Sequence, residues 1–137
     1  MMLFLDDVRT PDNCLDYMHR RIGLQADLYN RKWKVVSNYD EFASAIIMHH
    51  HEITHISFDH DLGEDVALEA IERGMSKTQA RKKLKKNVKS GYDCAVFVRD
   101  YYKHLNKSLP ILLVHSMNPV GTKKIIDMFK DEEKKKG

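Results

Sequence analysis

The sequence predicts an α/β domain in which a doubly wound parallel sheet of about four strands is covered by helices on both faces. Two observations predict this fold class: apolar runs alternate with segments of helical periodicity, and the apolar runs are continuous. Continuous runs are typical of parallel strands, which are buried on both faces. The length of 137 residues suits one core, so we expect residues 1–137 to form a single domain.

Four short runs are the expected strands. Residues 2–5 read MLFL, and residues 33–36 read WKVV, which is rich in β-branched and aromatic side chains. Residues 53–58 read ITHISF, and residues 110–116 read PILLVHS, the most apolar of the four. Parallel strands need right-handed crossovers, so the residues between these runs should contain helices.

Helical signals follow the second and third expected strands. Asn38 and Glu41 have the spacing of a capping box, and so have Ser76 and Gln79. Apolar stripes at helical spacing accompany these signals. The expected inward-facing residues are Tyr39, Phe42, Ile46 and His49; Ala80, Leu84 and Val88; and, in a helix from Tyr92 onward, Cys94, Phe97, Val98, Tyr101 and Leu105.

Three further segments complete the expected organisation. A short helix over 64–73 can end at Gly74. The last helix begins at NPVG, because Asn118 is a good N-cap and proline fits the first helical position. Its residues facing the sheet should be Ile125, Ile126 and Phe129. Residues 8–32 are polar and begin near RTPDN, so we expect an ordered loop with a short helix there.

The net charge of +3 is unevenly distributed. Residues 76–90 hold seven Lys or Arg and no acid, so the other residues carry a net charge of −4. This stretch belongs to a basic helical insertion that we expect around 64–90. It is either a solvated helix face or a patch that binds a polyanion such as nucleic acid.

The composition excludes several classes of protein. No run of 18 apolar residues exists, so we expect no membrane-spanning segment and no membrane partner. The start MMLFLDD reaches acidic residues too early for a signal peptide. Cys14 and Cys94 lie far apart without metal-ligand spacing, and we interpret them as reduced thiols of a cytoplasmic protein.

Polar side chains follow three of the expected strands. In open parallel sheets, ligands bind outside the carboxyl ends of the strands. The strand ends provide Asp6 and Asp7 with Arg9 just beyond; Asp59, His60 and Asp61; and His115, Ser116 and Asn118. We therefore expect Asp6 or Asp7, Asp59 or Asp61, and His115 to line one crevice. His115 and Ser116 should stand at the mouth of their strand rather than inside its packing.

These groups together indicate phosphoryl or phosphodiester chemistry. Clustered carboxylates repel one another unless a cation or a shared proton intervenes. Asp6, Asp7 and either Asp59 or Asp61 could hold Mg²⁺, which prefers oxygen ligands. Imidazoles suit general acid or base work near neutral pH. The backbone amides that open the last helix suit a phosphate.

Four motifs resemble, in order, those of the cyclic-phosphate processing receiver-like domains: LFLDDVRTP, ISFDHDLG, SGYDCA and HSMNPVG. These domains are relatives of the response-regulator receiver domain and occur in bacteria and phages. The resemblance implies a receiver or flavodoxin-like fold and the processing of cyclic phosphates on RNA ends or nucleotides. It also implies that Asp6 and Asp7 match the Mg²⁺-binding pair and that Asp59 matches the phosphoacceptor. The family's own additions match His60, Asp61, His115, Ser116 and Asn118.

Three functions stay open at this point. In a phosphoesterase, one of His60 and His115 would activate water and the other would protonate the leaving ribose oxygen. Asp6, Asp7 and Asp59 would bind a cation or orient the histidines, and Asp59 and Asp61 count with the histidines as catalytic candidates. The phosphate would be held by Arg9, Ser116, Asn118 and the helix amides. A non-catalytic module, for example one encoded by a phage, would contact a host protein or nucleic acid through 76–90. A true phosphoacceptor would need a lysine such as Lys123 to reach Asp59, because no expected strand ends in the receiver lysine.

Overall fold

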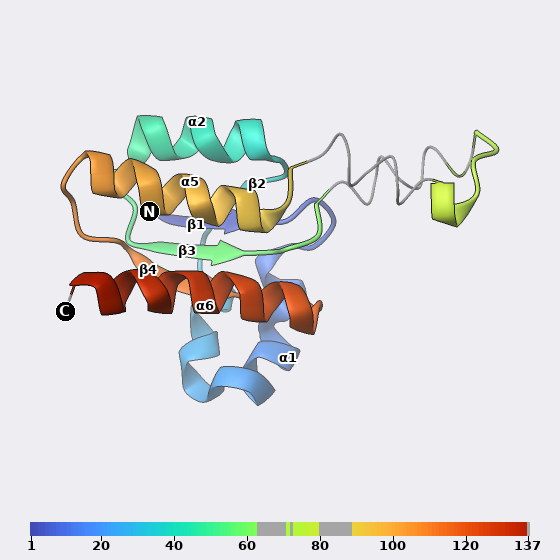
Figure 1. Cartoon of the computed structure of the whole chain (residues 1–137). Helices are drawn as coiled ribbons and strands as arrows, with labels where there is room; N and C mark the ends of the chain where they lie inside the picture. Colours follow the sequence, from blue (N-terminus) through green and yellow to red (C-terminus); the bar gives the residue numbers. More distant parts are fainter. Residues whose placement is uncertain (63–70, 72, 80–88, 137) are drawn as a thin grey trace.

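The computed structural model describes residues 1–62, 71, 73–79 and 89–136, and every structural statement below concerns these residues. Its four strands form one parallel sheet in the order β2-β1-β3-β4 (Figure 1). They are β1 (Met2–Leu5), β2 (Lys34–Val36), β3 (His55–Phe58) and β4 (Ile111–Val114). All four predicted strands are confirmed, with ends that differ by at most two residues.

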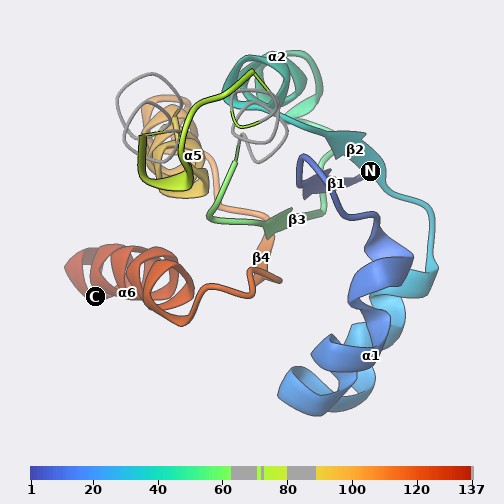
Figure 2. The same ribbon diagram turned by 90° about the vertical axis from the view of Figure 1, so that its right-hand side faces the viewer.

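Helices cover both faces of this sheet. They are α1 (Pro11–Ile22), the 3₁₀ helix η1 (Gly23–Asn30), α2 (Tyr39–His49), α5 (Gly91–His104) and α6 (Pro119–Lys136). In Figure 2, α2, α5 and α6 lie on one side of the sheet and α1 lies on the other. The parallel sheet between two helical layers confirms the predicted α/β fold class.

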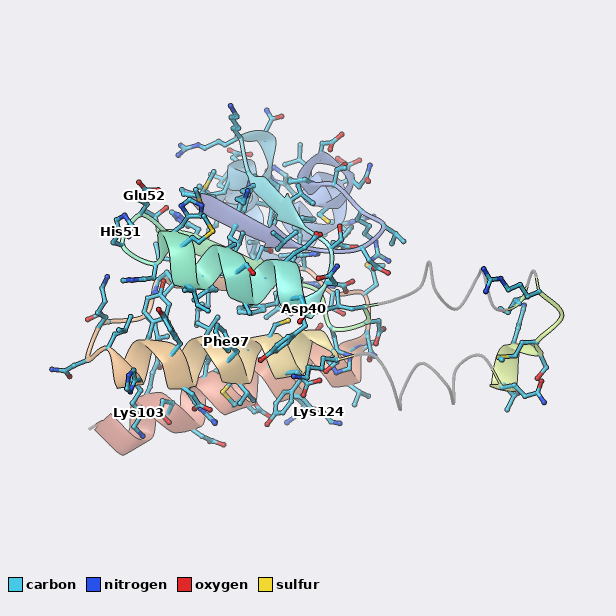
Figure 3. All side chains as sticks on the ribbon, turned by 90° about the horizontal axis from the view of Figure 1, so that it is seen from above. Asp40, His51, Glu52, Phe97, Lys103 and Lys124 are labelled. Carbon is cyan, nitrogen blue, oxygen red and sulfur yellow. The ribbon has the colours of Figure 1, made fainter. Side chains whose placement is uncertain are left out.

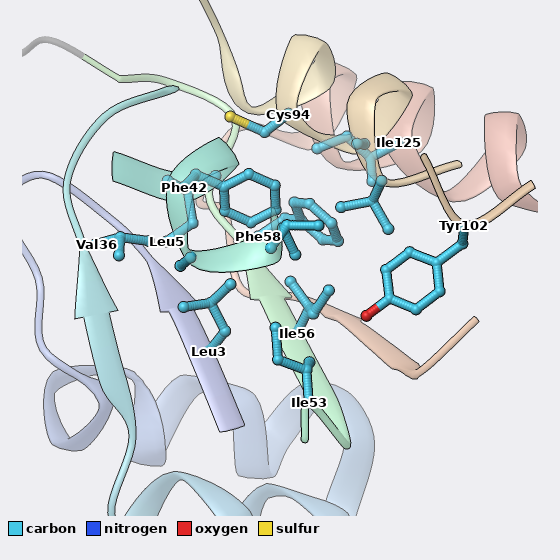
Figure 4. Close-up of a cluster of buried hydrophobic side chains, with 14 of the residues drawn as sticks. Leu3, Leu5, Val36, Phe42, Ile53, Ile56, Phe58, Cys94, Tyr102 and Ile125 are labelled. Atoms are coloured by element: carbon cyan, nitrogen blue, oxygen red, sulfur yellow. The ribbon is translucent and has the colours of Figure 1, made fainter. Parts of the chain in front are cut away.

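The alternation of side chains along each strand divides the core between the two faces. Leu3 and Leu5 of β1, with Ile56 and Phe58 of β3, join a hydrophobic cluster with α2, α5 and α6 (Figure 4). Phe4 points the other way and joins a second cluster under α1 and η1. Its partners there are Cys14, Met18, Ala26, Tyr29, Trp33 and Leu113.

The predicted helix starts agree with the structure. The Asn38 side chain accepts a hydrogen bond from the Glu41 amide at 2.9 Å and caps α2. Asn118 caps α6 in the same way, because its Oδ1 accepts from the Gly121 amide at 3.1 Å, and Pro119 occupies the first position of that helix. Side-chain capping satisfies amides that lack a partner within the helix.

Part of the basic insertion lies outside the described residues. Ser76 and Gln79 exchange the two predicted capping-box hydrogen bonds, both at 3.2 Å. The helix expected after them and the short helix expected over 64–73 fall largely on residues that the structure does not describe. Both remain predictions.

Two sequence-based expectations are wrong. The stretch 8–32 is not a loop with a short helix, because α1 and η1 fill most of it. Its polar composition is misleading, since α1 buries only Cys14 and Met18, one turn apart, and leaves its other faces polar. In α6, Ile125 is fully buried, but Ile126 is 38% exposed and lies on the flank of the helix.

The two cysteines are free and buried on opposite faces of the sheet. Burial raises the pKa of Cys14 to about 11 and also raises the pKa of Cys94, so neither side chain has the character of a reactive thiolate. Among the helices that the structure describes, none has the length and apolar character needed to cross a membrane.

Candidate functional site

Asp6, Asp59 and His115 form a row across the carboxyl edge of the sheet. Each comes directly after the last residue of β1, β3 or β4. The strand pairing continues into this row, because the Asp59 amide donates to the carbonyl of Leu5 and the His115 amide donates to the carbonyl of Phe58, both at 3.0 Å. The acidic residues and His115 therefore lie at one edge of the sheet, as the strand ends indicated, while the expectation that they line one crevice stays a prediction.

Three carboxylates meet at this edge. Asp6, Asp7 and Asp59 each offer an oxygen, and these oxygens lie within 4.8 Å of one another. Asp6 and Asp59 are almost completely buried, with exposed fractions of 1% and 2%. Such a group of like charges is costly to ionise in full without a compensating cation.

The surroundings divide the charge unequally between Asp6 and Asp59. Burial, followed by repulsion from Asp6, raises the pKa of Asp59 to about 8. Burial also acts to raise the pKa of Asp6, but hydrogen bonds from His115 and from the amides of Arg9 and Val8 outweigh it and lower that pKa. Asp6 is therefore the residue that stays ionised.

The donor set fits a divalent cation. Three carboxylates supply hard oxygen ligands of the kind that Mg²⁺ prefers. A cation would also offset the repulsion from Asp6 that, after burial, raises the pKa of Asp59. The Asp6–Asp7–Asp59 cluster could therefore hold a metal ion, as the sequence predicted.

His115 lies inside the core, which corrects the expectation that it stands at the mouth of its strand. Its exposed fraction is 0%, and its ring stacks on Phe4 with 4.2 Å between the ring centroids. Nδ1 lies 2.6 Å from Ser57 Oγ, and Nε2 lies 3.1 Å from Asp6 Oδ2. The reason is the cover provided by α1 and η1, in the stretch that the sequence suggested was a loop.

His60 and Asp61 belong to a second, more open cluster. His60 Nδ1 lies 2.9 Å from Asp61 Oδ1, and the Asn118 side-chain amide donates to both Asp61 oxygens at 3.2 Å. The His60 ring lies against the backbone of α6, because a Cβ placed on Gly121 would come within 2.2 Å of His60 Cγ. The His60 side chain is 18% exposed, so solvent reaches this imidazole but not that of His115.

The residues expected to hold phosphate differ in accessibility. Ser116 is 1% exposed, and its hydroxyl accepts from the Asn118 amide at 3.1 Å, which makes it part of the loop structure. The expectation that Ser116 stands at the strand mouth is therefore wrong. The side chain of Asn118 already has partners, because its Oδ1 caps α6 and its Nδ2 donates to Asp61. The Arg9 side chain is 29% exposed, and its Nη1 lies 3.6 Å from Asp6 Oδ2, so it places positive charge beside the carboxylates.

Lys123 does not fill the place of the receiver lysine. Its Nζ lies 2.8 Å from Asp127 Oδ2 on the next turn of α6, and its side chain is 77% exposed. Asp59, by contrast, is buried. This arrangement gives no support to the phosphoacceptor hypothesis in the form that uses Lys123.

Several residues that shape the site are not predicted from the sequence. From α1, the Tyr17 hydroxyl donates to the His115 carbonyl at 2.6 Å, and Arg21 donates to the Ser116 carbonyl at 3.1 Å. Gly91 opens α5 directly against β3, since a Cβ there would lie 1.6 Å from the Asp59 carbonyl oxygen. The glycine in SGYDCA was a usable signal for this close approach.

Nearly the whole chain matches one family. The family described as the cyclic-phosphate processing receiver domain matches residues 1–131. Neither a curated protein nor a solved structure matches the chain. The chain therefore belongs to the cyclic-phosphate processing receiver domain family.

Proposed function

We propose that this receiver-like domain is a phosphoesterase that opens a cyclic phosphate on an RNA end or a nucleotide. The observation that carries the proposal is the meeting, at one sheet edge, of the Asp6–Asp7–Asp59 cluster and a partly exposed histidine held by a carboxylate. A cation-binding cluster suits a phosphate, and a positioned imidazole suits proton transfer. The name of the family to which the chain belongs points to the same class of substrate.

His60 is the proposed general base. The Asp61 carboxylate accepts a hydrogen bond from His60 Nδ1, which leaves the lone pair of Nε2 available for a proton. His60 would take a proton from water as the water oxygen attacks phosphorus. The bond between phosphorus and one ribose oxygen breaks, and His60 returns the proton to that oxygen. The products are a phosphate monoester and a free hydroxyl group.

Asp6, Asp7 and Asp59 would hold the cation, which when bound would offset the negative charge that develops on the phosphate. Arg9 is the side chain best placed to approach a phosphate oxygen, because it is partly exposed beside these carboxylates. Ser116 and Asn118 would shape the loop rather than bind the phosphate directly, since their own polar groups already bond to one another and to α6.

The test is a product assay with RNA and nucleotides that carry a cyclic phosphate, with and without Mg²⁺. Hydrolysis adds one water to the substrate, which mass spectrometry detects. His60→Gln should lower turnover by roughly 10²–10⁴-fold. His51→Gln, at an exposed turn beyond α2, is the matched control and should keep the parent rate. No hydrolysis by the parent protein, or a parent rate in His60→Gln, would count against the proposal.

A second candidate function is a non-catalytic module that binds single-stranded nucleic acid. One observation favours it: a groove of about 450 Å³ is lined by Tyr39, Phe97 and Tyr101, and Lys89 Nζ lies 4.1 Å from the centre of the Tyr39 ring. Figure 3 views this side, where α2 and α5 lie next to one another. Two aspartates also line the groove, so base stacking rather than charge would dominate there.

Titration with a fluorescent oligonucleotide at several salt concentrations tests this candidate. Binding through the groove should be lost in Phe97→Ala and should depend weakly on salt. Binding through 76–90 should fall steeply with salt and should be lost when Lys82, Lys83, Lys85 and Lys86 are neutralised. Absence of binding at low salt would exclude the second candidate.

A further inference from the structure

A buried chain of hydrogen bonds runs from η1 to the carboxylate cluster. The Tyr29 hydroxyl lies 2.6 Å from Ser57 Oγ, and Ser57 Oγ lies 2.6 Å from His115 Nδ1. His115 Nε2 then lies 3.1 Å from Asp6 Oδ2. The exposed fractions of these four residues are 0–1%. Neither Tyr29 nor Ser57 has a place in the proposed reaction.

The direction of this chain follows from the Tyr29 hydroxyl. Among the described residues, this buried hydroxyl contacts Ser57 Oγ, so Tyr29 must donate its hydrogen there to avoid leaving it unsatisfied. Ser57 then donates its own hydrogen to His115 Nδ1. The imidazole consequently carries its hydrogen on Nε2 and donates it to the Asp6 carboxylate.

This chain of hydrogen bonds therefore ends on Asp6, one of the proposed cation ligands. Oδ1 of Asp6 accepts from the amides of Val8 and Arg9, both at 2.9 Å, and Oδ2 accepts from His115. Donors on both oxygens fix the rotation of the carboxylate within the Asp6–Asp7–Asp59 cluster. Hydrogen-bonding partners behind metal ligands orient them in this way in many metal sites.

We propose that Tyr29, Ser57 and His115 are positioning residues that hold Asp6 in the orientation needed to bind a divalent cation. In this arrangement His115 does not touch the substrate. Because Ser57 donates to Nδ1, the hydrogen of the His115 ring lies on Nε2. The proposal rests on the cation site of the proposed function, and it extends that site to residues on β3 and η1 that contact no substrate.

Two measurements on the protein of residues 1–137 test this proposal. The first is the ¹⁵N spectrum of histidine-labelled protein, with the His115 signals assigned by their loss in His115→Gln. The expected spectrum shows hydrogen on Nε2 and none on Nδ1. The second is the affinity for Mg²⁺ by titration calorimetry. Tyr29→Phe removes only the hydroxyl, and Ser57→Ala breaks the chain beside the ring.

The expected result is a loss of Mg²⁺ affinity of about 10–100-fold in Ser57→Ala, with a smaller loss in Tyr29→Phe. Tyr102→Phe is the matched control, because its buried hydroxyl bonds to the His50 carbonyl in the other core cluster, and its affinity should equal that of the parent. Thermal unfolding shows which variants are folded. If Ser57→Ala does not fold, Tyr29→Phe decides the result.

Three results would overturn the proposal. Hydrogen on Nδ1 of His115 would reverse the chain and would leave the proposed hydrolysis unaffected. Parent affinity in both folded variants would remove the positioning role alone. Absence of Mg²⁺ binding in the parent protein would remove the cation site, and with it both this inference and that part of the proposed function.

Discussion

Replacing Asp59 with Asn should make the metal-free protein more stable, by an amount that grows between pH 4 and pH 8. Asp59 is almost fully buried, and its nearest charged neighbours include another carboxylate, Asp6. Asn has nearly the same shape and can still accept the hydrogen bond that the His60 amide donates to Asp59 Oδ1 at 2.9 Å. The substitution therefore removes a carboxyl group that is costly to ionise, without removing this contact.

The size of the effect follows from the pKa of Asp59. Burial and repulsion raise this pKa from 3.8 to about 8, so between these pH values the native state holds a proton that the unfolded chain releases. Each pH unit of this difference lowers stability by about 1.4 kcal/mol, which gives an upper limit of roughly 5 kcal/mol at pH 8 and almost nothing near pH 4. The gain in Asp59→Asn should therefore grow as the pH rises from 4 to 8.

Thermal unfolding in EDTA at several pH values measures this gain. A stabilisation of 1 kcal/mol raises Tm by roughly 4 °C in a domain of this size, so the variant and the parent should be clearly separated at pH 8. Asp16→Asn is the control, because it makes the same charge change at an exposed position of α1. At a hundred times Kd, Mg²⁺ should stabilise the parent by about 2.7 kcal/mol and so raise its Tm, but it should not raise the Tm of Asp59→Asn.

Two results would refute this reasoning. A variant less stable than the parent at pH 8 in EDTA would mean that the Asp59 carboxylate is stabilised by its surroundings. A gain of equal size at pH 4 and pH 8 would mean that the effect does not come from the ionisation of Asp59.

Three further substitutions test other parts of the site. His115→Ala should cost about 2–4 kcal/mol in urea unfolding, because it opens a cavity beside Phe4 and leaves polar partners unsatisfied, and a cost below about 1 kcal/mol would contradict its burial. Gly121→Ala should displace the His60 ring and lower hydrolysis roughly 10²-fold with α6 intact, whereas parent activity would argue against His60 as the base. Gly91→Ala should cost at least about 2 kcal/mol, because its Cβ would meet the Asp59 carbonyl, and circular dichroism melting at the parent Tm would disprove that close contact.

The strands and most helices could be predicted because their signals are local. A continuous apolar run marks each strand, and Asn38, Ser76 and Asn118 each make the capping contact that their spacing indicated. Although Pro11 marks its start as Pro119 marks that of α6, the full length of α1 is not predicted from the sequence, because this helix buries so narrow a stripe that its polar composition is that of a loop. Its stability comes from packing on the sheet, which local patterns do not contain.

The position of the candidate site at the sheet edge was predictable, but the burial and the contacts of its side chains were not. The strand-end rule correctly brought Asp6, Asp7 and Asp59 together. The rule gives no information on what covers the edge, so it could not show that α1 and η1 enclose His115. It also could not show that Ser57, the polar residue inside an apolar strand, bonds to that histidine.

The side-chain alternation of strands explains why the two histidines differ. Phe4, Ser57 and Leu113 pair across the sheet, and Asp6, Asp59 and His115 come two residues later, so this row points to the same face, toward α1. His60 lies one residue out of step with that row, and its ring packs on Gly121 of α6 instead. His115 is fully enclosed, whereas His60 is partly exposed and directly follows Asp59, so His60 is the imidazole that solvent can reach. This difference favours a mechanism in which His60 both removes and returns the proton, while His115 acts through Asp6.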